Sequence, residues 1–302
     1  MNVALIGYGE VGRILGEDLR AADQSVTAFD LKLDAAEGEQ MRVHARAHGV
    51  TLAGSHAEAV GSAELVISAV TASQTVAAAE SCAAALPPRS FFLDFNSASP
   101  GAKMAAAEIV ARGAGRYVEG AVMTAVPPHR IKVPLLLGGP NAAALAPQLR
   151  DLGFAAQIAS GRLGVASATK MCRSVIIKGL EAMTVESLTA ARHYGVEDAV
   201  LASLHETFPG IDWEKQATYF FQRVIEHGRR RGEELREGAV TVQEAGLSPW
   251  SAAGTAERQT WVADLADGGL FGERGSPGFA RSPDWRVEAD RILDHLHRPQ
   301  ER

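Results

Sequence analysis

The segment Gly7-Tyr8-Gly9-Glu10-Val11-Gly12 constrains the fold of this chain more than any other stretch. It follows residues 2–6, an apolar run without polar alternation, which is typical of a strand buried on both faces of a parallel sheet. It precedes residues 13–22, in which apolar side chains recur at helical spacing. In such a unit the glycines permit a tight turn, close approach of a pyrophosphate and close packing of helix on strand. The segment predicts a dinucleotide site, with its six residues contacting the cofactor and the helix N-terminus facing the phosphates.

The end of the second predicted strand, residues 25–29, indicates which dinucleotide binds. Asp30 follows this strand, 18 residues beyond Gly12. A carboxylate at this place accepts hydrogen bonds from the adenosine ribose hydroxyls and repels a 2′-phosphate, so NAD is predicted over NADP. Lys32 would partly offset the repulsion, which keeps NADP as the alternative. The other interpretation of Asp30 is an ordinary solvated carboxylate at a strand end.

Strands and helices alternate through the first half of the chain. This alternation predicts right-handed βαβ crossovers and one doubly wound, mostly parallel sheet, an α/β Rossmann fold. The further strands are predicted at residues 50–53, 64–70, 90–95, 117–122, 131–137 and 154–158. Ligands of such sheets lie at the carboxyl ends of strands, which adds Val70, Thr71 and Asn96 to the predicted cofactor residues.

From about residue 164 the pattern changes to helices alone. They are predicted at residues 165–194, 196–208, 213–237, 240–245, 250–266 and 285–297. We therefore expect two domains, a Rossmann domain over residues 1–162 and an all-α domain over residues 163–302. A length of 302 residues is sufficient for a sizeable core in each.

Composition and charge narrow the class of protein. Hydrophobic residues make up 46% and charged residues 22%, as in ordinary globular proteins, and no apolar stretch is long enough to span a bilayer. The net charge of −6 gives no general affinity for nucleic acid or anionic membranes, so neither is predicted as a partner. The chain opens on a strand without a signal-peptide pattern, and a cytoplasmic protein is expected. Cys82 and Cys172 are expected to be free thiols, and the spacing of acidic residues and histidines predicts no metal site.

The predicted helix over residues 165–194 carries the most chemistry in the second half. Lys170, Ser174 and Lys178 are four residues apart, so each advances about 40° around the helix and all three share one face. Burying a lysine is costly without a partner or a function. In a cleft, desolvation and a cationic neighbour lower the pKa of a lysine, so that it exchanges protons near neutral pH. The alternative is that both lysines extend along the helix to solvent.

Three motifs in this order resemble the β-hydroxyacid dehydrogenase superfamily, which contains 3-hydroxyisobutyrate dehydrogenases, tartronate semialdehyde reductases and 6-phosphogluconate dehydrogenases. They are the glycine fingerprint, the loop Asp94-Phe-Asn96-Ser97-Ala-Ser-Pro100 and the GxxGxxxxxK pattern that ends at Lys170. The resemblance implies a Rossmann domain, a helical domain through which the protein dimerises, and a catalytic lysine, which Lys170 matches. It also implies that Asn96 and Ser97 lie in a loop that holds substrate and nicotinamide.

The chain departs from the family pattern in the residues that contact substrate. The family usually has Ser-Gly-Gly in a substrate loop, where this chain has Met123, Thr124 and Ala125, and it usually has Asn where this chain has Ser174. The C-terminal half resembles a branch related to the C-terminal domain of 6-phosphogluconate dehydrogenases. For the basic cluster of residues 227–231, two interpretations stay open, a solvated helix face or an arginine that pairs with an anionic substrate.

Together these features predict an NAD-dependent oxidoreductase that transfers a hydride between nicotinamide and a small β-hydroxyacid or related polar alcohol. Lys170 is predicted as general acid and base, and Asn96 as the residue that orients it or the substrate. The predicted substrate-binding residues are Ser97, Met123, Thr124, Ala125, Ser174 and Lys178. A homodimer is expected, with a hydroxyacid or oxoacid as the small-molecule partner. The rivals are an imine or enamine reductase on the same scaffold, against which Lys170 argues, and a non-catalytic dinucleotide sensor.

Overall fold

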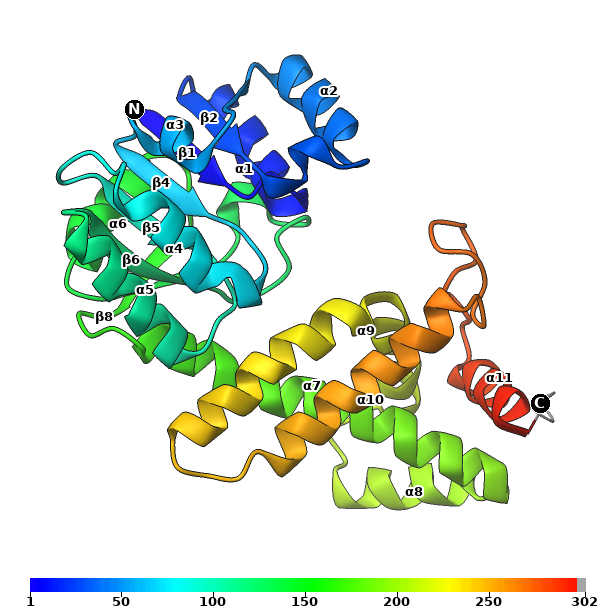
Figure 1. The fold of residues 1–302 in the computed structure, drawn as a ribbon. Coiled ribbons are helices and arrows are strands. Elements are labelled where there is room, and N and C mark those ends of the chain that lie inside the picture. Colours follow the sequence, from blue (N-terminus) through cyan, green and yellow to red (C-terminus); the bar gives the residue numbers. More distant parts are fainter. Residues whose placement is uncertain (298–302) are drawn as a thin grey trace, which may run out of the picture. The chain divides into compact units, whose positions relative to one another are not determined.

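The computed structural model describes residues 1–297, and the chain divides into two compact units, 1–171 and 172–302 (Figure 1). The division falls inside a long helix, α7 (Val165–Tyr194). The predicted domain limits, 1–162 and 163–302, place the boundary just before this helix and stay a prediction.

The first unit is built on one eight-stranded sheet with the strand order β3-β2-β1-β4-β5-β6-β7-β8. All neighbouring strands are parallel except β6 and β7, which are antiparallel. The predicted doubly wound Rossmann sheet is confirmed. The strands are β1 (Asn2–Ile6), β2 (Ser25–Phe29), β3 (Thr51–Leu52), β4 (Leu65–Ser68), β5 (Phe91–Asp94), β6 (Arg116–Val122), β7 (Leu135–Gly138) and β8 (Ala156–Ser160).

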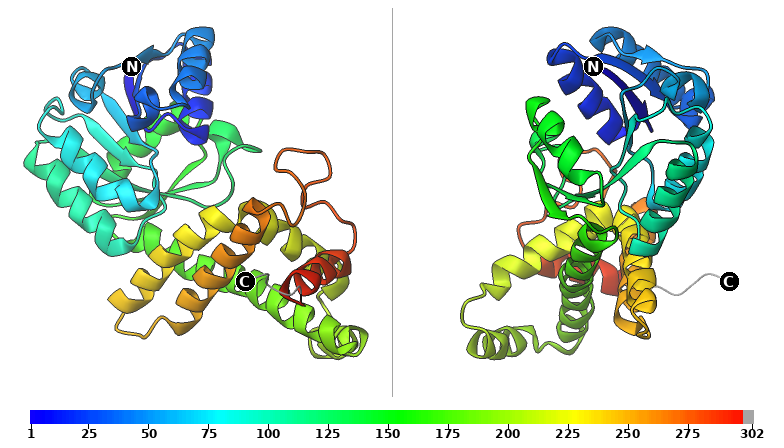
Figure 2. Two further views of the ribbon diagram at one scale, coloured as in Figure 1. Left: turned by 45° about the vertical axis from the view of Figure 1, so that its right-hand side comes forward. Right: turned by 90° about the vertical axis from the view of Figure 1, so that its left-hand side faces the viewer.

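Helices cover both faces of this sheet (Figure 2). On one face, α1 (Glu10–Ala21), α2 (Gly38–His48) and α6 (Ala142–Asp151) share an apolar core with the sheet. On the other face, α3 (His56–Val60), α4 (Thr75–Ala83) and α5 (Pro100–Arg112) form a second core. Short 3₁₀ turns are η1 (Leu31–Asp34), η2 (Ala72–Gln74) and η3 (Arg130–Lys132). The strand order reverses between β1 and β4, where doubly wound sheets bind their ligands.

Over its described residues, 172–297, the second unit contains helices and no strand, as predicted. It contains most of α7 together with α8 (Glu197–Thr207), α9 (Trp213–Glu244), α10 (Trp250–Asp267) and α11 (Trp285–His297). Figure 1 shows α9 and α10 side by side, and aromatic and aliphatic residues from all five helices share one core. The prediction of two helices over residues 213–237 and 240–245 is wrong, because α9 continues through Gly238. This glycine is buried, and an added Cβ would approach the Val175 side chain to 3.3 Å, so packing holds the helix together there.

The predicted strand over residues 131–137 begins later than expected. The structure has η3 first, and β7 starts at Leu135, directly after Pro134, which has no N–H to donate to a sheet. Asp18 on α1 holds η3 in place, since its carboxylate accepts from the Arg130 Nε at 2.9 Å and from the backbone N–H of Ile131 at 3.0 Å. Tertiary contacts therefore override the local β propensity.

Cys82 and Cys172 are free thiols, as expected. Among the helices of the described residues, we find none with the length and apolar character needed to cross a membrane.

Candidate active site

The glycine loop has the geometry that a bound pyrophosphate requires. Gly7 has a φ of +93°, and an added Cβ would lie 2.4 Å from the carbonyl oxygen of Ala69. A Cβ on Gly12 would lie 2.1 Å from the carbonyl oxygen of Gly7, so α1 can pack this closely on the turn only because residue 12 has no side chain. Gly9 differs, because among the described residues nothing beyond its neighbours in the chain lies within 4 Å of its Cβ position. The backbone at Gly9 is therefore open at the N-terminus of α1, where helix N–H groups attract phosphates.

Asp30 is fixed at the carboxyl end of β2 by two backbone hydrogen bonds. Its Oδ2 accepts from the N–H of Tyr8 at 2.7 Å and its Oδ1 accepts from the N–H of Lys32 at 2.8 Å. The side chain of Lys32 lies 3.5 Å from Glu37, and both side chains are more than half exposed, so solvent weakens this ion pair. Asp30 thus joins the glycine loop to the end of the second strand, and its contact with the ribose hydroxyls stays a prediction.

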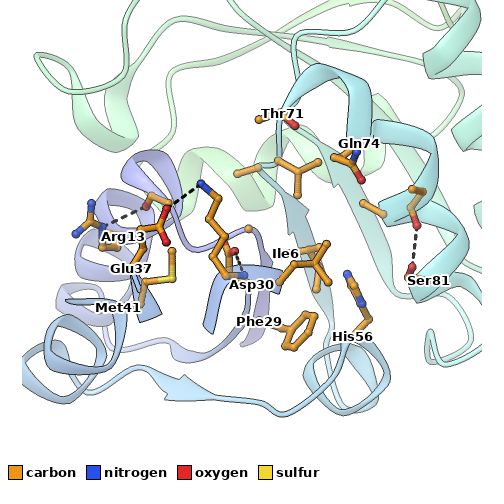
Figure 3. Close-up of a pocket in the computed structure, with 18 of the residues that line it drawn as sticks. Ile6, Arg13, Phe29, Asp30, Glu37, Met41, His56, Thr71, Gln74 and Ser81 are labelled. Atoms are coloured by element: carbon orange, nitrogen blue, oxygen red, sulfur yellow. Dashed lines mark hydrogen bonds and ion pairs between the residues drawn. The ribbon is translucent and has the colours of Figure 1, made fainter. Parts of the chain in front are cut away.

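A cavity of about 470 Å³ lies beside the ends of β1, β2 and β4 (Figure 3). Of the residues predicted to contact the cofactor, Gly7, Gly9, Asp30, Lys32, Val70 and Thr71 line it. Tyr8, Glu10, Val11, Gly12 and Asn96 are not among its lining residues. Tyr8 is buried on the other side of the loop, where its hydroxyl lies 3.0 Å from His44 Nδ1, and burial raises the pKa of Tyr8 to about 12.

The cavity also contains residues that the sequence analysis missed. Figure 3 shows Arg13 near Glu37 on one side, and Phe29 beside His56 on another. The rings of Phe29 and His56 meet edge to face with their centres 4.6 Å apart, and burial lowers the pKa of His56, which favours the neutral ring. Arg13 directly follows the fingerprint and could have been found from its position. His56 could not, because its place beside β2 depends on the fold of α3.

Asn96 joins the carboxyl ends of β4 and β5. Its side chain is almost fully buried, with Oδ1 accepting from the N–H of Val70 at 2.7 Å and Nδ2 donating to Ser68 Oγ at 3.0 Å. Both polar atoms of the amide are therefore engaged in fixing the turn that carries Ser97. This turn follows β5 directly, at the ligand-binding edge of the sheet.

A buried ion pair that the sequence analysis missed lies beneath this turn. Lys103 on α5 is fully buried, and its Nζ donates to Asp94 Oδ1 at 2.7 Å and to the carbonyl oxygens of Asp94 and Gly120 at 3.0 and 3.2 Å. Asp94 also accepts from the N–H of Asn96 and from the hydroxyl of Tyr117. Burial and the adjacent carboxylate raise the pKa of Tyr117, so this hydroxyl remains a donor. The network fixes the base of the Asn96 turn.

Lys170 reaches the same turn from the start of α7. Its Nζ hydrogen-bonds to Ser97 Oγ, and the side chain is half-buried. Glu119 on β6 holds this part of the helix, because its buried carboxylate accepts from the N–H groups of Gly164 at 2.7 Å and Ser167 at 2.5 Å. A carboxylate at a helix N-terminus is stabilised by the free N–H groups and the helix dipole. Glu119 therefore fixes the helical turn that precedes Lys170.

The variant Glu119→Gln tests this arrangement. An amide keeps one acceptor oxygen but turns an NH₂ group toward a backbone donor, so we expect a loss of about 1.5–3 kcal/mol at this end of α7. Hydrogen exchange measured by mass spectrometry should become faster for the peptide that covers residues 164–170. Glu108→Gln on the exposed face of α5 is the matched control. Unchanged exchange in Glu119→Gln would show that the carboxylate does not hold the helix.

The remaining predicted substrate residues fall in two places. Met123, Thr124 and Ala125 follow β6 in the first unit, and Thr124 is exposed. Ser174 and Lys178 lie on α7 in the second unit and are buried. The Nζ of Lys178 lies 2.6 Å from Glu234, and burial lowers the pKa of Lys178 while Glu234 opposes the shift. Lys178 therefore does not extend to solvent.

The basic cluster of residues 227–231 contains exposed and buried ion pairs. Arg229 pairs with Asp264 and Asp267, and Arg230 pairs with Glu234, all at 2.6 Å and with the arginines about half exposed. Arg231 is buried and pairs with Glu181 on α7. The interpretation as a solvated helix face therefore holds for Arg229 and Arg230. It does not hold for Arg231, whose guanidinium lies in the interior of the second unit.

Comparisons with known proteins agree with this fold. Residues 2–143 match the NAD binding domain of 6-phosphogluconate dehydrogenase, and residues 191–262 match a domain of unknown function, DUF1932. A conserved hypothetical protein from Sinorhizobium meliloti 1021 is 34% identical, with a TM-score of 0.78, over 98% of this chain and 97% of that chain. A second structure, described as similar to 3-hydroxyacid dehydrogenases, is 27% identical, with a TM-score of 0.69, over 88% of this chain and 99% of that chain.

A more distant structure has the same fold. The 3-hydroxyisobutyrate dehydrogenase of Mycobacterium tuberculosis is 17% identical, with a TM-score of 0.70, over 96% of this chain and 98% of that chain. The predicted fold and the NAD(P) cofactor are confirmed. The chain belongs to the β-hydroxyacid dehydrogenase superfamily, in a branch that combines the NAD-binding domain with a DUF1932 domain.

Proposed function

We propose that this protein is an NAD-dependent dehydrogenase that acts on the C–OH group of a small β-hydroxyacid or related polar alcohol. The observation that carries the proposal is the hydrogen bond between Lys170 Nζ and Ser97 Oγ, on the turn after β5. An ammonium group and a hydroxyl at this sheet edge suit an alcohol or carbonyl oxygen. When bound in the glycine-lined cavity, NAD supplies the hydride chemistry.

In this mechanism Lys170 moves the proton. During oxidation its neutral amine takes the hydroxyl proton of the substrate, and during reduction its ammonium returns that proton to the carbonyl oxygen. Ser97 holds the same oxygen, and Asn96 keeps the turn in place through its bonds to Val70 and Ser68. Thr124 and its neighbours Met123 and Ala125 are proposed to contact the rest of the substrate. Ser174 and Lys178 are buried in the second unit, where Lys178 pairs with Glu234, so they are not part of this proposal.

A substrate panel tests the proposal. The purified protein is incubated with NAD⁺ and a series of β-hydroxyacids, with and without phosphate groups, while the absorbance of the reduced cofactor is followed. We expect turnover of at least one acid. A parallel series contains NADH with oxoacids and imines. Turnover of imines alone, or tight NADH binding without turnover of any alcohol or oxoacid, would replace the proposal with the reductase or the sensor interpretation.

The variant Asp30→Asn tests the proposed preference for NAD. The amide removes the charge that repels a 2′-phosphate and also turns an NH₂ group toward a backbone donor. Both cofactors should therefore bind less well, but the ratio of kcat/KM for NAD⁺ to that for NADP⁺ should fall about tenfold or more. Asp34→Asn on the exposed surface of η1 is the control. An unchanged ratio in Asp30→Asn would show that this carboxylate does not select the cofactor.

We also propose that the protein forms a homodimer through the second unit. Ile176, Leu180 and Met183 are exposed on α7 at intervals of four and three residues, which places them in one apolar stripe. Sedimentation velocity should detect a dimer, and the double variant Ile176→Asp with Met183→Asp should shift it to the monomer. Val43→Asp, at an exposed apolar residue on α2, should remain a dimer. A dimer that survives both charges on α7 would place the interface elsewhere.

A further inference from the structure

One polar cluster in the first unit combines two histidines with a carboxylate, outside the dinucleotide cavity. Glu17 lies on α1, and His44 and His48 lie one turn apart on α2. Within residues 1–297 this is the one group of at least three histidine, cysteine or acidic side chains whose ligand atoms all lie within 4.8 Å of one another. The i, i+4 spacing places both imidazoles on one helix face, as in helical zinc ligands.

The distances in this cluster are close to those of a tetrahedral metal site. Glu17 Oε1 lies 2.8 Å from His44 Nε2 and 3.8 Å from His48 Nε2. Bonds of about 2.0–2.1 Å to a tetrahedral zinc ion place neighbouring ligand atoms about 3.3 Å apart. The two distances lie on either side of this value, so small side-chain adjustments admit the ion. The rings of His44 and His48 already lie side by side, with their centres 4.5 Å apart.

Neighbouring groups hold two of these side chains from behind. His44 Nδ1 lies 3.0 Å from the hydroxyl of Tyr8, and Glu17 Oε2 lies 2.5 Å from Arg130 Nη2. Histidines that bind metals are typically held in this way at the nitrogen that does not bind, which fixes the tautomer and the ring orientation. Without a metal, the Nε2–H of His44 donates to Glu17; with Nδ1–H donating to Tyr8 instead, the lone pair of Nε2 would be free to bind a metal ion.

Charge and exposure also suit a divalent cation. The Glu17 carboxylate faces both imidazoles and pairs with Arg130. Asp18 adds a second carboxylate on Arg130, so Glu17, Asp18 and Arg130 together have a formal net charge of −1. The exposed fractions of the side chains are 16% for His44, 27% for Glu17 and 41% for His48. Solvent therefore reaches the cluster and can supply a fourth ligand.

We propose that Glu17, His44 and His48 form a binding site for a divalent transition metal of the zinc type, with water as the fourth ligand. Nitrogen and oxygen donors in a four-coordinate set are those that zinc prefers. The metal would join α1 to α2 and, through Tyr8, both helices to the glycine loop. The sequence did not predict this site, because Glu17 lies 27 positions before His44 and meets it only in the folded sheet.

Titration with Co²⁺ tests the site directly. The protein, without a histidine tag and freed of metal by a chelator, is titrated with Co²⁺ while its visible d–d absorption is recorded, and Zn²⁺ is then added as competitor. We expect one Co²⁺ per chain with the bands of a four-coordinate site, and displacement by Zn²⁺. His48→Ala should weaken binding about a hundredfold, and Tyr8→Phe, which keeps all three ligands, about tenfold. His205→Ala, at an exposed histidine on α8, should bind as the wild type does.

Thermal unfolding provides a second readout. Zn²⁺ should raise the unfolding temperature of the wild-type protein and of His205→Ala, but not that of His48→Ala, because a ligand stabilises only the state that binds it. A far-UV circular dichroism spectrum equal to that of the wild type would show that His48→Ala is folded. Absence of the Co²⁺ bands in the wild type, or their full retention in folded His48→Ala, would overturn the proposal.

Discussion

Lys170→Ala is expected to lower kcat about 10²- to 10⁴-fold while leaving the affinity for NADH nearly unchanged. The loss follows from the proposed proton transfer, because no group would then exchange a proton with the substrate oxygen beside Ser97. The affinity should persist because the cavity at β1, β2 and β4 does not include Lys170. Steady-state kinetics with the preferred hydroxyacid and NADH fluorescence titrations measure the two quantities on the same preparation.

Two further variants separate proton transfer from simple charge. Lys170→Arg keeps a positive charge but cannot lose its proton near neutral pH, so its kcat should be nearly as low as that of Lys170→Ala. Thr169→Ala, at the exposed neighbouring residue, should behave as the wild type does. High activity in Lys170→Arg would mean that the lysine acts only as a cation. An equal loss of NADH binding in Lys170→Ala would show that its role is structural.

Lys103→Met is expected to give the largest loss of stability, about 3–5 kcal/mol. The substitution leaves the Asp94 carboxylate buried without its cation, and such uncompensated charges are strongly destabilising. Urea unfolding should be followed by far-UV circular dichroism, since all four tryptophans, Trp213, Trp250, Trp261 and Trp285, lie in the second unit and report poorly on the sheet.

A double variant identifies the cause of that loss. Lys103→Met with Asp94→Asn removes both charges, so it should recover part of the stability lost in Lys103→Met alone. The two losses would simply add if Lys103 stabilised the fold through its aliphatic chain rather than its charge. That result would contradict the assignment of the ion pair as the base of the Asn96 turn.

Features encoded in short segments could be predicted from the sequence. Three such features appear in the structure as expected, because they depend on neighbouring residues and on periodicity. They are the strand, glycine turn and helix around Gly7, the carboxylate at Asp30, and the limits of α7. The turn at Asn96 could be found because the family resemblance supplied its motif.

Features that depend on distant contacts could not be predicted. Glu119 accepts a hydrogen bond from Gly164, 45 positions later in the sequence. Lys103 donates to the carbonyl oxygen of Gly120, which lies close to it only because β5 and β6 pair. A lysine or glutamate in an apolar segment is a weak signal by itself, because only the fold shows which donors surround it. The continuity of α9 through Gly238 also could not be predicted, because packing against other residues outweighs the low helix propensity of glycine there.

The most direct test of the central claim is the transfer of deuterium from substrate to cofactor. The protein is incubated with NAD⁺ and a mixture of β-hydroxyacids that carry deuterium on the carbon bearing the hydroxyl, and the nicotinamide is analysed by mass spectrometry. We expect deuterated NADH in the wild-type reaction and about 10²- to 10⁴-fold less of it with Lys170→Ala. NADH binding with no deuterium on the nicotinamide, for every acid in the mixture, would contradict hydride transfer from a β-hydroxyacid.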